Sequence, residues 1–209
     1  RFIKDQVSYK LRALLESRAQ LAERIDEFMF GDDAEADAFI YSIYSDLCAG
    51  RVDAQTFARV LEQTGLYEDD IPRLVRLASQ IPVHDVGRRI FIHLDRVSAP
   101  DGFSDYGARV CPFYNYLQPA LVLLDHEAID PLGVVRVAAE LVMHHGFTAD
   151  ALAASFPDMA ARRHVGPRGA RRLVEAFDDV QESHFARTYS VLASFVRLLE
   201  LAARDVADP

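Results

Sequence analysis

The spacing of the first apolar side chains limits the fold of this chain more than any other feature of its sequence. From Val7 to Phe28 these positions alternate four and three residues apart, and one position in the series is Arg18. This heptad spacing is typical of a helix that buries one side, and Gly31 follows as a helix stop. Additional apolar side chains widen the stripe, which favours packing into a globular core over a free coiled coil. The sequence therefore predicts a long first helix, which could also supply a homodimer contact.

Residues that begin and end helices recur along the rest of the chain. Asp53 and Asp130 each precede an apolar stretch of helical spacing, and Pro131 suits the first helical turn after Asp130. Gly146 follows that second stretch as a helix stop. Between residues 170 and 206 there is neither proline nor glycine, which predicts one very long helix or two abutting helices.

One stretch is compatible with either a helix or a strand. Apolar residues in Val83–Val97 recur at helical spacing, whereas Ile90–Leu94 could also alternate as a strand. A single strand has no partner with which to form a sheet, so a helix is the prediction. The expected fold is all-α, a single compact bundle of about eight helices over residues 1–209, with a possible subdivision near 98–119.

The segment 98–119 is the longest irregular stretch, and it combines turn residues with aromatic ones. Aromatic side chains in such a segment either cover one end of a core or line a ligand pocket or an interface. Asn115 and Gln118 lie beside them and could orient a ligand. The aromatic residues proposed for binding are Phe103, Tyr106, Phe113, Tyr114 and Tyr116.

A second candidate binding site is an arginine-rich turn that leads into a predicted helix through Gly166–Gly169. Helix N-termini bind anions, and positive side chains there oppose the helix dipole, so an anionic partner would explain the cluster. The alternative is a solvated turn whose arginines pair with acidic side chains elsewhere. The arginines are Arg162, Arg163, Arg168, Arg171 and Arg172.

Histidine and glutamate side chains provide a third candidate site. Glu140 and His144 are four residues apart and share a helix face. Together with His126 and His184 they could form a catalytic or metal site between helices. However, the chain lacks the Glu-x-x-His pair that di-metal helical bundles use twice.

Charge and composition narrow the possible partners. The formal net charge of −9 opposes nonspecific binding to nucleic acid or to an anionic membrane. No apolar run reaches the roughly 18 residues of a membrane-spanning helix. Cys48 and Cys111 have apolar or aromatic neighbours and no metal-ligand spacing, which predicts reduced core thiols in the cytoplasm.

Two functions remain open from the sequence. The first is a helical binding or regulatory module that docks a protein partner, or a small anionic or aromatic ligand, through the aromatic segment and the arginine-rich turn. The second is an enzyme or sensor that uses the interhelical His/Glu site, with or without a metal. The chain contains no Walker A, dinucleotide-binding, nucleophile-elbow or EF-hand motif.

Overall fold

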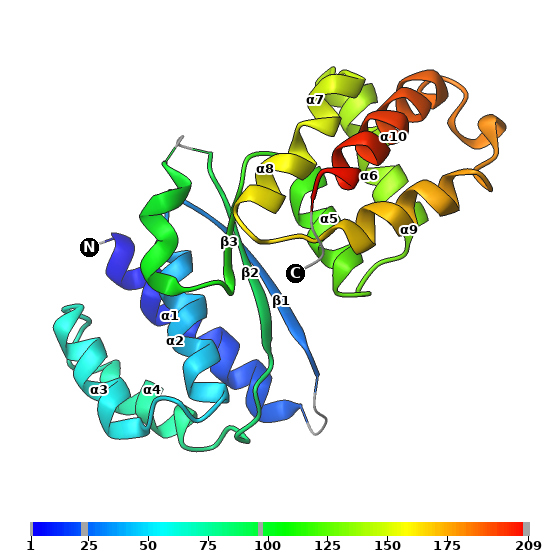
Figure 1. Ribbon diagram of the computed structural model, residues 1–209. Coiled ribbons are helices and arrows are strands. Elements are labelled where there is room, and N and C mark those ends of the chain that lie inside the picture. Colours follow the sequence, from blue (N-terminus) through cyan, green and yellow to red (C-terminus); the bar gives the residue numbers. More distant parts are fainter. Residues whose placement is uncertain (1, 22–24, 96–97, 207–209) are drawn as a thin grey trace. The chain divides into compact units, whose positions relative to one another are not determined.

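The computed structural model describes residues 2–21, 25–95 and 98–206 of the chain. These residues fall into two compact units, Arg1–Pro112 and Phe113–Pro209. The boundary between the units lies inside the segment 98–119, which the sequence marks as a possible subdivision. Figure 1 shows the elements of both units.

The N-terminal unit contains a sheet, so the prediction of an all-α helical bundle is wrong. Its three strands are hydrogen bonded in the order β1, β2, β3, and β1 runs parallel to β2. The register pairs Glu27 with Gly87 at one end and Asp32 with His93 at the other, and it shifts between Glu27 and Phe28. The strands are β1 (Glu27–Asp32), β2 (Gly87–His93) and β3 (Val110–Phe113).

The same unit contains helices, of which α1 and α2 lie alongside the strands in Figure 1. Successive strand residues point to opposite faces of a sheet. Met29, Ile90 and Ile92 belong to the core that includes the helices, whereas Phe30 and Phe91 stack on each other with ring centroids 4.7 Å apart. The helical elements are α1 (Phe2–Gln20), α2 (Asp37–Cys48), α3 (Ala54–Gln63), α4 (Ile71–Ala78) and the 3-10 helix η1 (Pro100–Tyr106).

The first helix is shorter than the sequence predicts. It ends at Gln20, and Phe28, the last residue of the heptad series, lies in β1 together with the expected helix stop Gly31. Residues 22–24 lie outside the described residues. The few apolar residues of a short strand can match helical spacing as well as alternating spacing. This explains why the first helix was predicted to continue to Phe28. The seam residues Val7 and Leu11 are buried in the core of their own unit.

The predicted helix over Val83–Val97 is also wrong, because Gly87–His93 forms the central strand β2. The strand has two partners, β1 and β3, but neither could be recognised as a strand from the sequence. β1 continues the apparent pattern of the first helix, and β3 contains Pro112 within the aromatic segment predicted to be irregular. Proline is tolerated there because β3 is an edge strand.

The C-terminal unit is helical, and Asp130 and Gly146 cap one of its helices as predicted. Asp130 accepts a hydrogen bond from the Gly133 N–H at 2.7 Å, and the Thr148 hydroxyl accepts one from Ala151 at 3.2 Å. Gly146 ends its helix with φ of 67°. The helices are α5 (Leu117–Asp125), α6 (Pro131–His145), α7 (Ala149–Ala153), α8 (Ser155–Ala161), α9 (Pro167–Phe177), the 3-10 helix η2 (Glu182–Phe185) and α10 (Tyr189–Arg204).

The stretch without proline or glycine at the end of the chain forms two separate helices. α9 ends at Phe177, and a connection that contains η2 leads to the start of α10 at Tyr189. The rings of these two residues stack with centroids 5.7 Å apart. Leu173 of α9 and Leu199 of α10 are fully buried, so the break lets both helices contribute to one core. Among the described residues, no helix is long and apolar enough to cross a membrane.

Candidate functional site

The carboxyl ends of β1 and β2 bring acidic and polar residues together. Asp32 pairs with His93 at the end of the strand register. The next residue, Asp33, donates its backbone N–H to the His93 carbonyl at 3.0 Å, and its carboxylate accepts a hydrogen bond from the Ser98 N–H at 3.2 Å. Ligands of open α/β sheets bind outside the carboxyl ends of parallel strands. We name Asp32, Asp33, His93 and Ser98 the carboxylate edge.

The turn that follows β1 is fixed by the first of these carboxylates. Asp32 Oδ1 accepts hydrogen bonds from the backbone N–H groups of Ala34 at 2.8 Å and Glu35 at 3.1 Å. This Asx turn defines the course of the chain from β1 towards α2. Within the described part of the chain, Asp32 Oδ2 makes no hydrogen bond. One oxygen therefore holds the turn, and the other is available for a ligand.

A partly buried ion pair also holds this turn in place. Asp37 at the start of α2 is 2% exposed, and it accepts hydrogen bonds from the backbone N–H of Asp32 and from Lys10 of α1. Lys10 also bonds to Glu35. Gly31 is required here because a Cβ at this position would lie 2.3 Å from Asp37 Oδ2. Two helices and the end of β1 are thus joined in one polar network.

Burial by itself would lower the pKa of Lys10, but hydrogen bonds to Asp37 and Glu35 outweigh it and raise the pKa. The same hydrogen bond from Lys10 lowers the pKa of Glu35. The lysine therefore stays positively charged and Glu35 stays negatively charged at neutral pH. Because Asp32 and Asp33 add two further carboxylates, negative charge exceeds positive charge around this turn.

The metal-binding capacity of the carboxylate edge is limited. In the described ranges, no group of three or more His, Cys, Asp or Glu side chains is arranged to hold a metal ion. Asp32 and Asp33 can therefore supply at most part of a coordination shell. Mg²⁺ accepts this situation, since it commonly takes one or two protein carboxylates and completes its shell with water and ligand phosphates.

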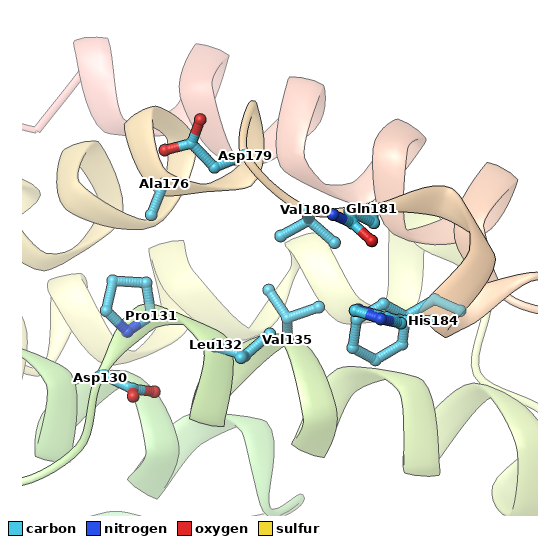
Figure 2. Close-up of a pocket in the computed structure, with 10 residues that line it drawn as sticks. Asp130, Pro131, Leu132, Val135, Ala176, Asp179, Val180, Gln181 and His184 are labelled. Atoms are coloured by element: carbon cyan, nitrogen blue, oxygen red, sulfur yellow. The ribbon is translucent and has the colours of Figure 1, made fainter.

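A second candidate site lies within the helical unit. Figure 2 shows a cleft in which Pro131, Leu132 and Val135 of α6 face Ala176 and Val180 across an apolar space of about 400 Å³. Polar side chains are placed around this apolar centre: Asp130, Asp179, Gln181 and His184.

A neighbouring cleft of about 310 Å³ continues along the same helix. Its lining includes Arg136, Glu140 and Met143 of α6 and, from the connection before α10, Arg187. His184 and Phe185 line both clefts. The two clefts therefore meet at η2.

The five predicted aromatic residues occupy different environments. Phe103 and Tyr106 lie in η1 and pack against the core of the N-terminal unit. Phe113 is buried in β3, whereas Tyr114 and Tyr116 are exposed by 47% and 53%. The first two cover a core, which is one of the two roles expected from the sequence.

The two amides beside these aromatic residues are engaged in hydrogen bonds within the protein. The Gln118 side chain accepts a hydrogen bond from the Tyr114 N–H and donates one to Asp158, both at 2.6 Å. Asn115 donates to the Ser155 hydroxyl at 3.1 Å. These contacts tie the start of α5 to α8, which is a structural role.

Arg162 and Arg172, two of the predicted arginines, lie beside acidic side chains of their own unit. Arg162 pairs with Asp158, and Arg172 lies 3.5 Å from Glu127. The other three are exposed on the surface, at Arg163, Arg168 and Arg171.

The helix N-terminus beside these arginines already holds a carboxylate of the protein. Asp125 accepts hydrogen bonds from the backbone N–H groups of Gly166 and Gly169, both at 2.7 Å. An external anion at the start of α9 would have to compete for these donors. The sequence offers no local signal for this contact, because Asp125 precedes Gly166 by 41 residues.

The residues of the predicted His/Glu site lie on the surface. Glu140 and His144 share a helix face as predicted, with 3.3 Å between carboxylate and imidazole, and their side chains are 65% and 63% exposed. His126 is exposed at the end of α5, and His184 is exposed in η2. They do not form a metal-binding group in the described residues.

Comparisons with known proteins do not add to this description. No protein-family model matches the sequence, and no curated protein or solved structure is significantly similar to it.

Proposed function

We propose that the N-terminal unit binds Mg²⁺ at the carboxylate edge and, through this ion, a small anionic ligand. The observation that carries the proposal is the placement of two adjacent carboxylates, Asp32 and Asp33, at the carboxyl end of a parallel strand beside the end of β2. Many open α/β sheets bind their ligands outside the carboxyl ends of their strands. Carboxylate oxygens are the protein ligands that Mg²⁺ prefers.

The hydrogen bonds around the turn support this proposal. Asp32 Oδ1 accepts the hydrogen bonds of the turn, which leaves the second carboxylate oxygen able to bind a cation. The partly buried pair of Lys10 and Asp37 holds the turn in place before any ligand arrives, which reduces the cost of ordering the site on binding. The excess of carboxylates attracts a cation first, and an anionic ligand would follow only once the cation is bound.

A binding role agrees with one of the two functions that the sequence leaves open, but it places the ligand elsewhere. The aromatic segment is divided between different environments, and the helix start in the arginine-rich turn is capped by Asp125. Cys48 and Cys111 are both buried, and neither forms a disulfide bond among the described residues. Reduced thiols of this kind support the further proposal that the protein acts in the cytoplasm.

The test is a calorimetric titration of the full chain with Mg²⁺, followed by thermal unfolding with and without the ion. Asp33→Asn replaces a negatively charged metal ligand by a neutral amide. We therefore expect Mg²⁺ affinity to fall at least tenfold and the stabilisation by Mg²⁺ to shrink accordingly. The matched control is Asp69→Asn, which removes the same charge from an exposed turn of the same unit and should leave Mg²⁺ binding unchanged.

Equal Mg²⁺ affinity in Asp33→Asn, Asp69→Asn and the unchanged protein would show that the ion only screens an acidic surface, and the proposal would then be wrong. Circular dichroism of each variant shows whether the fold is intact. If Asp33→Asn unfolds, Asp32→Glu provides a second test, because it keeps the charge but displaces the oxygen that faces the ligand.

A further inference from the structure

The two clefts of the helical unit form one groove along α6. Leu132, Val135, Ala139 and Met143 are spaced three and four residues apart, so they lie on one side of the helix. Over these eleven positions the helix advances roughly 16 Å. Leu132 and Met143 are exposed by 38% and 47%, although both are large apolar side chains. We name this surface the α6 groove.

One end of the α6 groove has an apolar centre with polar side chains around it. There, Leu132 and Val135 face Val180 across the cleft in Figure 2, and His184 lies where this cleft meets the next one. The space of about 400 Å³ is within the range of small-molecule sites, which are mostly apolar with few polar groups.

The other end of the α6 groove is lined by two arginines. Arg136 and Arg187 both line it, and within the described part of the chain neither side chain forms an ion pair or a hydrogen bond. Arg162 and Arg172 in the same unit do have acidic partners. Glu140 also lines this end, but its carboxylate lies 3.3 Å from His144 on the next turn of α6.

We propose that the α6 groove binds a single-chain amphiphile with an anionic head group, either a carboxylate or a phosphate. Arg136 and Arg187 would bind the head group, because guanidinium groups form paired hydrogen bonds with both kinds of anion. The chain would pass His184 and Phe185 and lie between Leu132 and Val180 in the apolar cleft. This site is separate from the carboxylate edge and does not depend on Mg²⁺.

The test compares ligands that share a chain and differ in the head group. Dodecanoate, dodecyl phosphate and dodecylamine are titrated into the full chain by calorimetry, each below its micelle-forming concentration. We expect saturable binding of at least one of the two anionic compounds, tenfold or more tighter than that of dodecylamine. The tighter of the two anions identifies the preferred head group.

Variants locate both parts of the ligand. Replacing both arginines, Arg136→Gln with Arg187→Gln, should weaken binding of the anionic compounds at least tenfold and abolish their advantage over dodecylamine. Arg197→Gln is the control, because it removes an exposed arginine of α10 outside the groove. Leu132→Asn should weaken all three ligands and leave the preference for the anionic head group intact.

Equal affinity for dodecanoate, dodecyl phosphate and dodecylamine would overturn the proposal, since it would show partition of the chain into apolar surface without recognition of the head group. Unchanged affinity of the double arginine variant for the anionic compounds would overturn it as well. Unchanged affinity of Leu132→Asn would show that the chain does not occupy the apolar cleft.

Discussion

At the scale of single residues, Asp125 decides whether a helix start is open to a ligand. Its carboxylate accepts the backbone N–H groups of Gly166 and Gly169 and so takes the position of an N-terminal cap for α9. Gly169 allows this close approach, because a Cβ there would lie 2.2 Å from Asp125 Oδ1. Arginines around the turn therefore surround a helix end whose donors are already satisfied.

We expect Gly169→Ala to lower the free energy of unfolding by about 1–2 kcal/mol, because the new methyl group displaces the Asp125 cap. The sign of this change is informative, because replacing glycine by alanine in a helix interior normally stabilises the helix by about 1 kcal/mol. Urea denaturation of the full chain, followed by circular dichroism, measures the change.

Gly133→Ala is the control for this substitution. Gly133 also lies near the start of a helix, but the nearest atom to its Cβ would be Asp130 Oδ1 at 3.4 Å, an ordinary contact. Here we expect no loss of stability and a gain of up to about 1 kcal/mol. A similar gain for Gly169→Ala would contradict the close contact between Asp125 and α9.

At the scale of elements, one carboxylate connects α2 to the chain that enters β3. Asp46 accepts two hydrogen bonds from Arg109, at 2.6 and 2.8 Å, and a third from Arg51 at 2.8 Å. Burial would raise the pKa of Asp46, but the hydrogen bonds from Arg109 and Arg51 outweigh it and hold the pKa below its ordinary value of 3.8. Folding therefore favours the charged form of this side chain.

We expect Asp46→Asn to cost about 1–2 kcal/mol at neutral pH, because the charge-assisted bonds to Arg109 are lost. A lowered pKa stabilises the fold at pH values above the unfolded value of 3.8, and this contribution disappears as the pH falls through the folded pKa. The difference between variant and unchanged protein should therefore shrink in acid. Urea denaturation at neutral pH and at about pH 2.5 measures it.

Asp85→Asn removes a carboxylate that also pairs with Arg51, at 3.1 Å, but whose side chain is 62% exposed. Exposed pairs contribute little, so we expect a change below about 0.5 kcal/mol. Equal losses in Asp46→Asn and Asp85→Asn would show that net charge, and not the link from α2 to the sheet, determines the effect.

The helices could be predicted because their signals are local. Asp53, Asp130 and Thr148 each bond to a backbone N–H three residues ahead, so the cap and the helix appear together in the sequence. The strands have no such signal. β1 and β2 are parallel and are separated by three helices, so no turn between them marks a pair.

The candidate sites could likewise be predicted only where their signals are local in the sequence. The sequence does not mark Asp32 and Asp33 as site residues, because the end of β1 can be recognised only after β1 itself. An apolar run of three residues before Gly31 is too short to separate a strand from a helix by its period. His144 and Glu140 were placed correctly on one helix face, but their exposure on the surface follows from packing and has no pattern in the sequence.

At the scale of the whole molecule, the chain combines an α/β unit and a helical unit, each with its own candidate site. The sequence predicts one helical bundle because its helical signals are spread evenly over both halves. The carboxylate edge belongs to the first unit and the α6 groove to the second. The two proposals can therefore be tested separately on the full chain.

The most direct test of the carboxylate edge is a nuclear magnetic resonance titration of the full ¹⁵N,¹³C-labelled chain with Mg²⁺. We expect extended-strand carbon shifts over 27–32 and 87–93, and Mg²⁺-dependent changes that concentrate at Asp32, Asp33 and His93 and are lost in Asp33→Asn. Helical shifts over those ranges would contradict the parallel sheet. Mg²⁺-dependent changes spread over acidic residues of both units would contradict the binding site.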